Sequence, residues 1–253
     1  MTPETIGLLA GAGLLAGGVN AVAGGGSLIS FPALLAAGYP PVTANVTNTV
    51  ALFPGYAGSV AGGRSELVGQ NTRVRVLGAT SVVGGIGGAV LLLTTPGEVF
   101  RAVVPFLILM ACGLLLAQPR LAAVVQRRAL ARGKGEFSPT LLLSVLLAAV
   151  YGAYFGAGLG VMLLGVLGIF LAEPLRRINA QKNVQSLVIN SVALVVFGLF
   201  GPVAWEAVLV IAVASLLGGF LGAKLASRIP SNLLRGAVVV YGVVVALVLL
   251  LEG

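Results

Sequence analysis

The polar residues that could bind a ligand lie in two short runs, each at the start of an apolar segment. Together the runs contain Asn45, Thr47, Asn48, Asn179, Gln181, Lys182 and Asn183. Amide and hydroxyl side chains donate hydrogen bonds, and a charge within an apolar segment indicates a functional site. We therefore expect a site for a small anion, with Lys182 as its charge. Alternatively, Lys182 extends to a membrane surface beside Arg176 and Arg177.

Two glycine-rich breaks stand near these runs. The residues at the breaks are Gly24, Gly25, Gly26 and Ser27 in the first, and Gly156, Gly158 and Gly160 in the second, with Asn20 and Tyr154 beside them. We expect Ser27 to cap a short helix whose free N–H groups attract an anion. The alternatives are that the glycines only allow close helix packing, and that Asn20 and Tyr154 only join helices.

The amino-acid composition indicates that these residues belong to a membrane protein. Hydrophobic residues form 58% of the chain and charged residues only 9%, which is too little polar surface for a soluble globule. The net charge of +8 lies in short loops, which favours cytoplasmic loops over nucleic-acid binding. With no histidine, no aspartate and one cysteine, the chain is expected to be no enzyme and to hold no metal or cofactor.

The elements that position the site repeat at an offset of 134 residues, as Gly26 and Gly160 or Asn45 and Asn179 illustrate. The predicted first repeat is 1–117, a basic linker is 118–138, and the second repeat is 139–253. Apolar segments are 5–38, 43–63, 74–94 and 98–117, then 139–172, 178–200, 204–226 and 232–251. The first segment of each half is too long for one straight helix across about 30 Å of hydrocarbon.

Each overlong segment either crosses the membrane once, tilted or kinked, or turns back at its glycines as a hairpin. Single crossings divide the Lys and Arg residues almost evenly between the two sides, whereas hairpins leave only Arg101 outside. The positive-inside rule favours the hairpins. We therefore predict an all-α integral membrane protein of two inverted-topology repeats, each a broken-helix hairpin plus three transmembrane helices. Both termini lie outside, and the 118–138 linker is cytoplasmic.

Several motifs resemble the TauE/SafE sulfite exporter family, also called the toluene sulfonate uptake permease family. They are Gly18-Val19-Asn20-Ala21-Val22-Ala23-Gly24-Gly25-Gly26-Ser27-Leu28-Ile29-Ser30-Phe31-Pro32, Gly38 to Asn48, Gly156-Ala157-Gly158-Leu159-Gly160, Asn179-Ala180-Gln181-Lys182-Asn183 and Gly218 to Lys224. The resemblance covers nearly the whole chain. It implies a two-fold repeat and small sulfur-containing anions as substrates, such as sulfite, thiosulfate, sulfoacetate and other organosulfonates.

The expected function is secondary transport of such an anion across the plasma membrane by alternating access. The expected partners are a small anionic substrate and the lipid bilayer. A passive anion channel and a membrane subunit of a larger assembly are the alternatives. Unsaturating flux without counterflow would indicate the channel, and a constant partner on purification would indicate the subunit.

Overall fold

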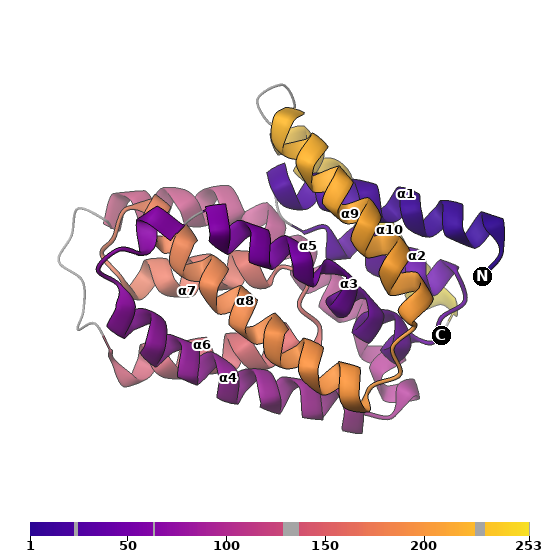
Figure 1. Cartoon of the computed structure of the whole chain (residues 1–253), viewed down its shortest axis with the longest axis horizontal. Coiled ribbons are helices and arrows are strands. Elements are labelled where there is room, and N and C mark those ends of the chain that lie inside the picture. Colours follow the sequence, from indigo (N-terminus) through magenta and orange to yellow (C-terminus); the bar gives the residue numbers. More distant parts are fainter. Residues whose placement is uncertain (23–24, 63, 129–136, 226–230, 253) are drawn as a thin grey trace.

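The computed structural model describes all residues except 23–24, 63, 129–136, 226–230 and 253. Within these residues it contains helices and no strands, which confirms the predicted all-α class. The elements are α1 (Pro3–Val22), α2 (Ser27–Ala36), α3 (Pro41–Gly62), the 3-10 helix η1 (Arg64–Leu67), α4 (Asn71–Thr94), α5 (Gly97–Arg128), α6 (Pro139–Tyr154), α7 (Leu159–Phe170), α8 (Leu175–Phe200), α9 (Trp205–Leu225) and α10 (Ser231–Glu252) (Figure 1).

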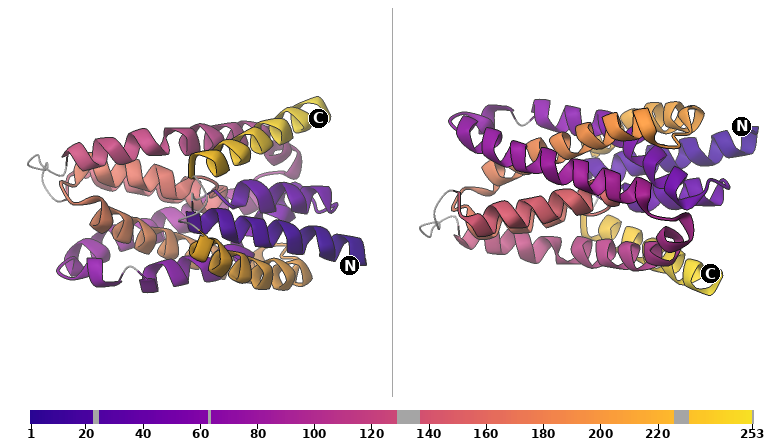
Figure 2. Two further views of the ribbon diagram at one scale, coloured as in Figure 1. Left: turned by 90° about the horizontal axis from the view of Figure 1, so that it is seen from above. Right: turned by 90° about the horizontal axis from the view of Figure 1, so that it is seen from below.

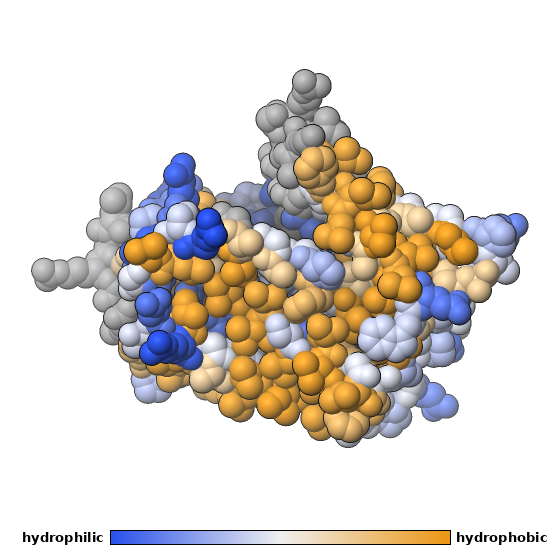
Figure 3. Space-filling view, viewed as in Figure 1, coloured by the Kyte–Doolittle hydropathy of each residue, from blue (hydrophilic) through white to orange (hydrophobic). Residues whose placement is uncertain are grey.

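The surface and the helix lengths fit a multi-pass membrane protein. An apolar band crosses the middle of the molecule, and hydrophilic groups gather toward its two ends (Figure 3). Four helical stretches in the described part of the chain are long and apolar enough to cross a membrane, namely Asn71–Thr94, Gly97–Arg127, Leu175–Phe200 and Leu233–Leu251. Many large apolar side chains on these helices are exposed, as expected where lipid replaces water.

Both overlong apolar segments are broken near the expected glycines. The first divides into α1 and the 10-residue α2, and the second into the 16-residue α6 and the 12-residue α7. At about 1.5 Å per residue, α2 and α7 are too short to cross the hydrocarbon core. Each packs against the helix that precedes it. The N- and C-termini lie at the same end of the molecule (Figures 1 and 2).

The two halves are held together by close helix crossings. The most extensive packing joins α1 to α9 and α4 to α6. A Cβ on Gly17 would collide with the carbonyl oxygen of Ser215, and one on Gly88 with the carbonyl oxygen of Val150. Small residues at these crossings let backbones approach each other, which is how helices associate in lipid.

Helix α5 extends to Arg128, well beyond the apolar segment that ends at residue 117 in the sequence. Its last turns hold Leu121 and Val125, which pack against two glycines of α7, Gly165 and Gly168. These turns continue the helix because Leu, Ala and Val at helical spacing have a partner to pack against. Part of the basic linker, 129–136, lies outside the described residues.

Candidate functional site

The described part of the first break is stabilised by a hydrogen bond to the side chain of Asn20. Gly25 has a φ of 90°, which favours glycine, and the Gly26 amide donates to Oδ1 of Asn20 at 2.7 Å. Gly26 is the N-cap of α2, so the expectation that Ser27 caps this helix is wrong. Ser27 instead begins the helix because the chain turns one residue earlier. Gly24, predicted to line the site, lies outside the described residues.

Helix α3 brings two asparagines toward this break. The Asn48 Oδ1 accepts a hydrogen bond from the hydroxyl of Ser30 at 2.5 Å, and that hydroxyl also lies 3.3 Å from the Gly26 carbonyl oxygen. Asn45, one turn earlier, is 1% exposed, and its Oδ1 has no hydrogen-bond partner among the described residues. The buried face of α3 therefore carries one amide oxygen without a hydrogen bond, that of Asn45, beside one that is hydrogen-bonded, that of Asn48.

The second break is a tight turn stabilised by a tyrosine. Gly156 and Gly158 have φ values of 78° and 77°, and Gly158 is the left-handed N-cap of α7. The hydroxyl of Tyr151 donates to the carbonyl oxygen of Ala157 at 2.5 Å. The turn also pairs amides at the start of α7, since the N–H groups of Leu159 and Val161 donate to the carbonyl oxygens of Gly156 and Gly158.

The two breaks lie against the same part of α5. A Cβ on Gly25 would lie 3.1 Å from Cδ2 of Leu115, and one on Gly158 would lie 3.4 Å from the Cα of Ala111. These α5 residues are one turn apart. The breaks of the two halves, widely separated in sequence, therefore face the same short stretch of one helix.

Two further contacts connect the second break to helices of the first half. The Asn45 Nδ2 donates to the carbonyl oxygen of Tyr154 at 2.8 Å, which links α3 to the end of α6. The rings of Phe31 and Phe155 meet edge to face with centroids 5.5 Å apart. Asn45 and Tyr154, both predicted as site residues, are thus brought together, although Tyr154 contributes its backbone rather than its hydroxyl.

Lys182 lies beside the start of α7. Its Nζ is 3.9 Å from the position that a Cβ would occupy on Gly160, the second residue of that helix. The ammonium group therefore lies next to the N-terminal end of α7, where the helix dipole carries partial positive charge. The ammonium group and the positive end of the helix dipole both attract negative charge.

Gln181, the neighbour of Lys182, is fully buried, and neither its Nε2 nor its Oε1 has a hydrogen-bond partner in the described chain. A buried amide left without partners costs free energy of about 1–3 kcal/mol. Protein interiors pair such groups with a ligand or with water. The Gln181 amide is therefore a buried hydrogen-bonding group that no described protein group satisfies.

Other predicted residues face elsewhere. The Thr47 hydroxyl accepts a hydrogen bond from the Ala204 amide at 3.0 Å, which connects α3 to the α8–α9 turn. The Asn183 Nδ2 donates to the Ser59 carbonyl oxygen at 3.4 Å, toward α3. Asn179 is half-buried in the first turns of α8. The structure gathers Asn45, Asn48 and Lys182 around the breaks. It does not bring Thr47, Asn179 or Asn183 to them.

Sequence reasoning missed three polar residues of this interior: Ser30, Tyr151 and Gln185. Ser30 is a polar residue in the otherwise apolar α2, and Gln185 stands one helical turn after Gln181, so both carried a recognisable signal. Tyr151 carried none, because its partner is a backbone carbonyl set by the turn. Among the described residues, no three His, Cys, Asp or Glu side chains cluster as metal ligands.

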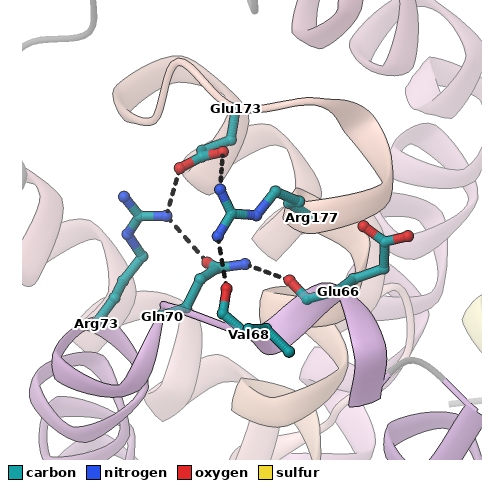
Figure 4. Close-up of polar contacts among 6 residues, drawn as sticks. All are labelled: Glu66, Val68, Gln70, Arg73, Glu173 and Arg177. Atoms are coloured by element: carbon teal, nitrogen blue, oxygen red, sulfur yellow. Dashed lines mark hydrogen bonds and ion pairs between the residues drawn. The ribbon is translucent and has the colours of Figure 1, made fainter.

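An ion-pair network joins the two halves at the end where η1 meets the α7–α8 connection (Figure 4). Glu173 lies 3.1 Å from Nη1 of Arg73 and 2.9 Å from Nη1 of Arg177. Gln70 accepts a hydrogen bond from Arg73, and Arg177 donates to the Val68 carbonyl oxygen. Arg73 is only 8% exposed, so the network ties the start of α4 tightly to the start of α8.

The chain is similar to membrane transporters along its whole length. The family model for Sulfite exporter TauE/SafE matches residues 9–249. Probable membrane transporter protein ORF9 of Sinorhizobium sp is 27% identical over 242 residues, which cover 95% of this chain and 90% of that protein. Probable membrane transporter protein YfcA of Escherichia coli K12 is 26% identical over 253 residues, covering 100% of this chain and 92% of that protein.

A probable membrane transporter protein of Haemophilus influenzae is 29% identical over 235 residues, covering 90% of this chain and 88% of that protein. No solved structure matches the chain significantly. The motifs that resembled the family in sequence thus belong to a match that extends across nearly all of the helices. The chain belongs to the TauE/SafE sulfite exporter family of membrane transporters.

Proposed function

We propose that the protein is a secondary transporter that moves a small oxyanion, such as sulfite, thiosulfate or an organosulfonate, by alternating access. The observation that carries the proposal is the position of Lys182 beside the start of α7, next to the meeting point of the two breaks. Broken helices whose N-terminal ends point to an anionic group are the usual construction of such binding sites. The family name supports a sulfur oxyanion as the substrate class.

The packing of the helices supports an inverted repeat. The 134-residue offset relates α1 to α6 and α4 to α9, so the two most extensive contacts, α1 with α9 and α6 with α4, are copies of each other. The α1–α2 unit lies toward the end that carries the termini, while α6 and α7 extend toward the opposite end (Figure 2). Three crossings between the two broken segments would account for this inversion.

Alternating access then involves one half moving against the other. The Arg73–Glu173 pair joins the halves at one end of the molecule, and it would have to separate when that end opens. With the positive-inside rule, this end faces the cytoplasm and both termini face outside, in the plasma membrane. The proposed anion site lies around the two breaks and consists of Gly26, Asn45, Asn48, Gly160 and Lys182.

Transport by the purified protein in liposomes tests the proposal. Sulfite, thiosulfate, sulfoacetate and taurine would each be supplied outside, and uptake would be followed with and without the same anion inside. Saturable uptake that is accelerated by internal anion indicates a carrier. Unsaturating flux without counterflow would indicate an anion channel instead, and absence of flux for all four compounds would contradict anion transport.

A further inference from the structure

Two buried amides lie close to Lys182 on α8, one just before it and one about a helical turn after it. Gln181 and Gln185 stand one helical turn apart on the same face, and both side chains are fully buried. Within the described chain, Nε2 and Oε1 of Gln181 and Nε2 of Gln185 have no hydrogen-bond partner. Two neighbouring amides with unpaired groups are unusual in an interior, where most such groups are satisfied.

The orientation of the Gln185 amide is fixed by the first half of the chain. The hydroxyl of Ser81, a fully buried residue of α4, donates to Oε1 of Gln185 at 2.8 Å. Because the oxygen is engaged, the amide nitrogen of Gln185 remains the unpaired group. A serine of one half therefore sets which end of an amide in the other half is available to a ligand.

The available groups favour an anion over a metal cation. Gln181 and Gln185 each present an unpaired NH₂ donor, while Gln181 alone presents an unpaired oxygen. A hard metal cation such as Ca²⁺ or Mg²⁺ requires about six or more oxygen ligands, which this pair cannot supply. An oxyanion can accept N–H hydrogen bonds from both amides at once.

We propose that Gln181 and Gln185 form a neutral second subsite for the transported oxyanion, and that Ser81 positions Gln185 for it. This inference rests on the proposed transport of a small oxyanion. The ammonium of Lys182 attracts the anion, and the buried amides accept it without a countercharge. Sites along a transport path must bind well enough to admit an ion yet weakly enough to release it. Neutral donors meet that requirement better than a second lysine.

The repeat-related positions in the first half do not form a matching pair of unpaired amides. At the 134-residue offset, Thr47 corresponds to Gln181 and is already paired with the Ala204 amide, while the apolar Ala51 corresponds to Gln185. Ser215 corresponds to Ser81, and its hydroxyl bonds to the Ala212 carbonyl oxygen at 3.0 Å. The subsite is therefore particular to the α4–α8 interface, and Ser215 is a matched control for Ser81.

The test uses Gln185→Met, which keeps the side-chain length but removes the donor. Purified wild type and variant are compared in equilibrium binding and in liposome uptake, with whichever of sulfite, thiosulfate and sulfoacetate the wild type transports fastest. We expect the Kd to change by no more than about twofold while the maximal uptake rate falls about tenfold, a loss of about 1.4 kcal/mol. Gln185→Glu should lower the rate at least as much, because a carboxylate repels the anion.

The positioning role of Ser81 has its own comparison. Ser81→Ala should reduce uptake several-fold, Ser81→Thr should restore it because the hydroxyl returns, and Ser215→Ala should leave it unchanged. Uptake by Gln185→Met at the wild-type rate would overturn the subsite while leaving anion transport intact. Parallel loss of binding and uptake would also overturn it, because Gln185 would then act at the Lys182 site. Absence of any uptake by the wild type would overturn both proposals.

Discussion

The guanidinium of Arg73, in the first half of the chain, lies 3.1 Å from the carboxylate of Glu173, in the second half (Figure 4). Glu173 also pairs with Arg177, four residues later on α8. One carboxylate thus balances two guanidinium groups, one of which is nearly buried. This relationship couples the stability of the fold to the contact between its halves.

Replacing the carboxylate should therefore destabilise the protein. Glu173→Gln leaves Arg73 buried beside a neutral amide, and we expect a loss of about 1–3 kcal/mol in the free energy of unfolding. Thermal denaturation in detergent would measure the lower Tm. Glu206→Gln is the control, because its pairing with the N-terminal amine is at 3.5 Å and Glu206 is largely exposed. Equal Tm values for the two variants would contradict a structural role for Glu173.

The close packing of α4 against α6 predicts how two glycine substitutions will change the Tm. A Cβ on Gly88 would collide with the Val150 carbonyl oxygen, whereas a Cβ on Gly87 would lie 3.8 Å from Cγ2 of the same valine. We expect Gly88→Ala to lower the Tm by several degrees because the helices must separate. Gly87→Ala should leave it unchanged or raise it, since alanine favours helix over glycine by about 1 kcal/mol. A Gly88→Ala protein as stable as Gly87→Ala would show that the crossing tolerates separation.

The hydrogen bond from Asn45 to the Tyr154 carbonyl oxygen makes a third prediction, about function. Asn45→Ala removes the link between α3 and the second break, and also the unpaired buried oxygen. We expect uptake to fall by about tenfold, equivalent to about 1.4 kcal/mol, with folded protein still recovered. Asn71→Ala, at an exposed asparagine of α4, should transport normally. Normal uptake by Asn45→Ala would remove this residue from the site.

Much of the fold could be predicted from the sequence because the determining signals are local or periodic. Long apolar runs predict the helices, and the glycines at Gly25 and Gly158 mark the breaks, where the chain adopts positive φ values. The 134-residue repeat pairs α1 with α6 and α4 with α9, and these four helices make the two most extensive contacts. The end of α5 was missed because its last turns depend on packing against α7, which no local pattern records.

The site could be predicted less well, because a polar side chain has several possible partners and packing selects among them. Thr47 stands between two site asparagines in sequence, yet its hydroxyl pairs with the Ala204 amide. Ser27 has the right residue type for a cap, but Gly26 takes that position. The orientation of the Gln185 amide could not be predicted, because it depends on a hydrogen bond from Ser81, more than one hundred residues away in the sequence.

The central claim is that Lys182 supplies the charge that binds the transported anion. Its direct test is equilibrium binding of sulfite, thiosulfate and sulfoacetate to purified wild type, Lys182→Met and Arg176→Gln. Methionine keeps the length of the side chain without its charge, and Arg176 is an exposed basic residue of the same helix. We predict that Lys182→Met stays folded but binds its anion at least about tenfold more weakly, a loss of about 1.4 kcal/mol or more, while Arg176→Gln binds like wild type. Unchanged affinity in a folded Lys182→Met protein would contradict the claim.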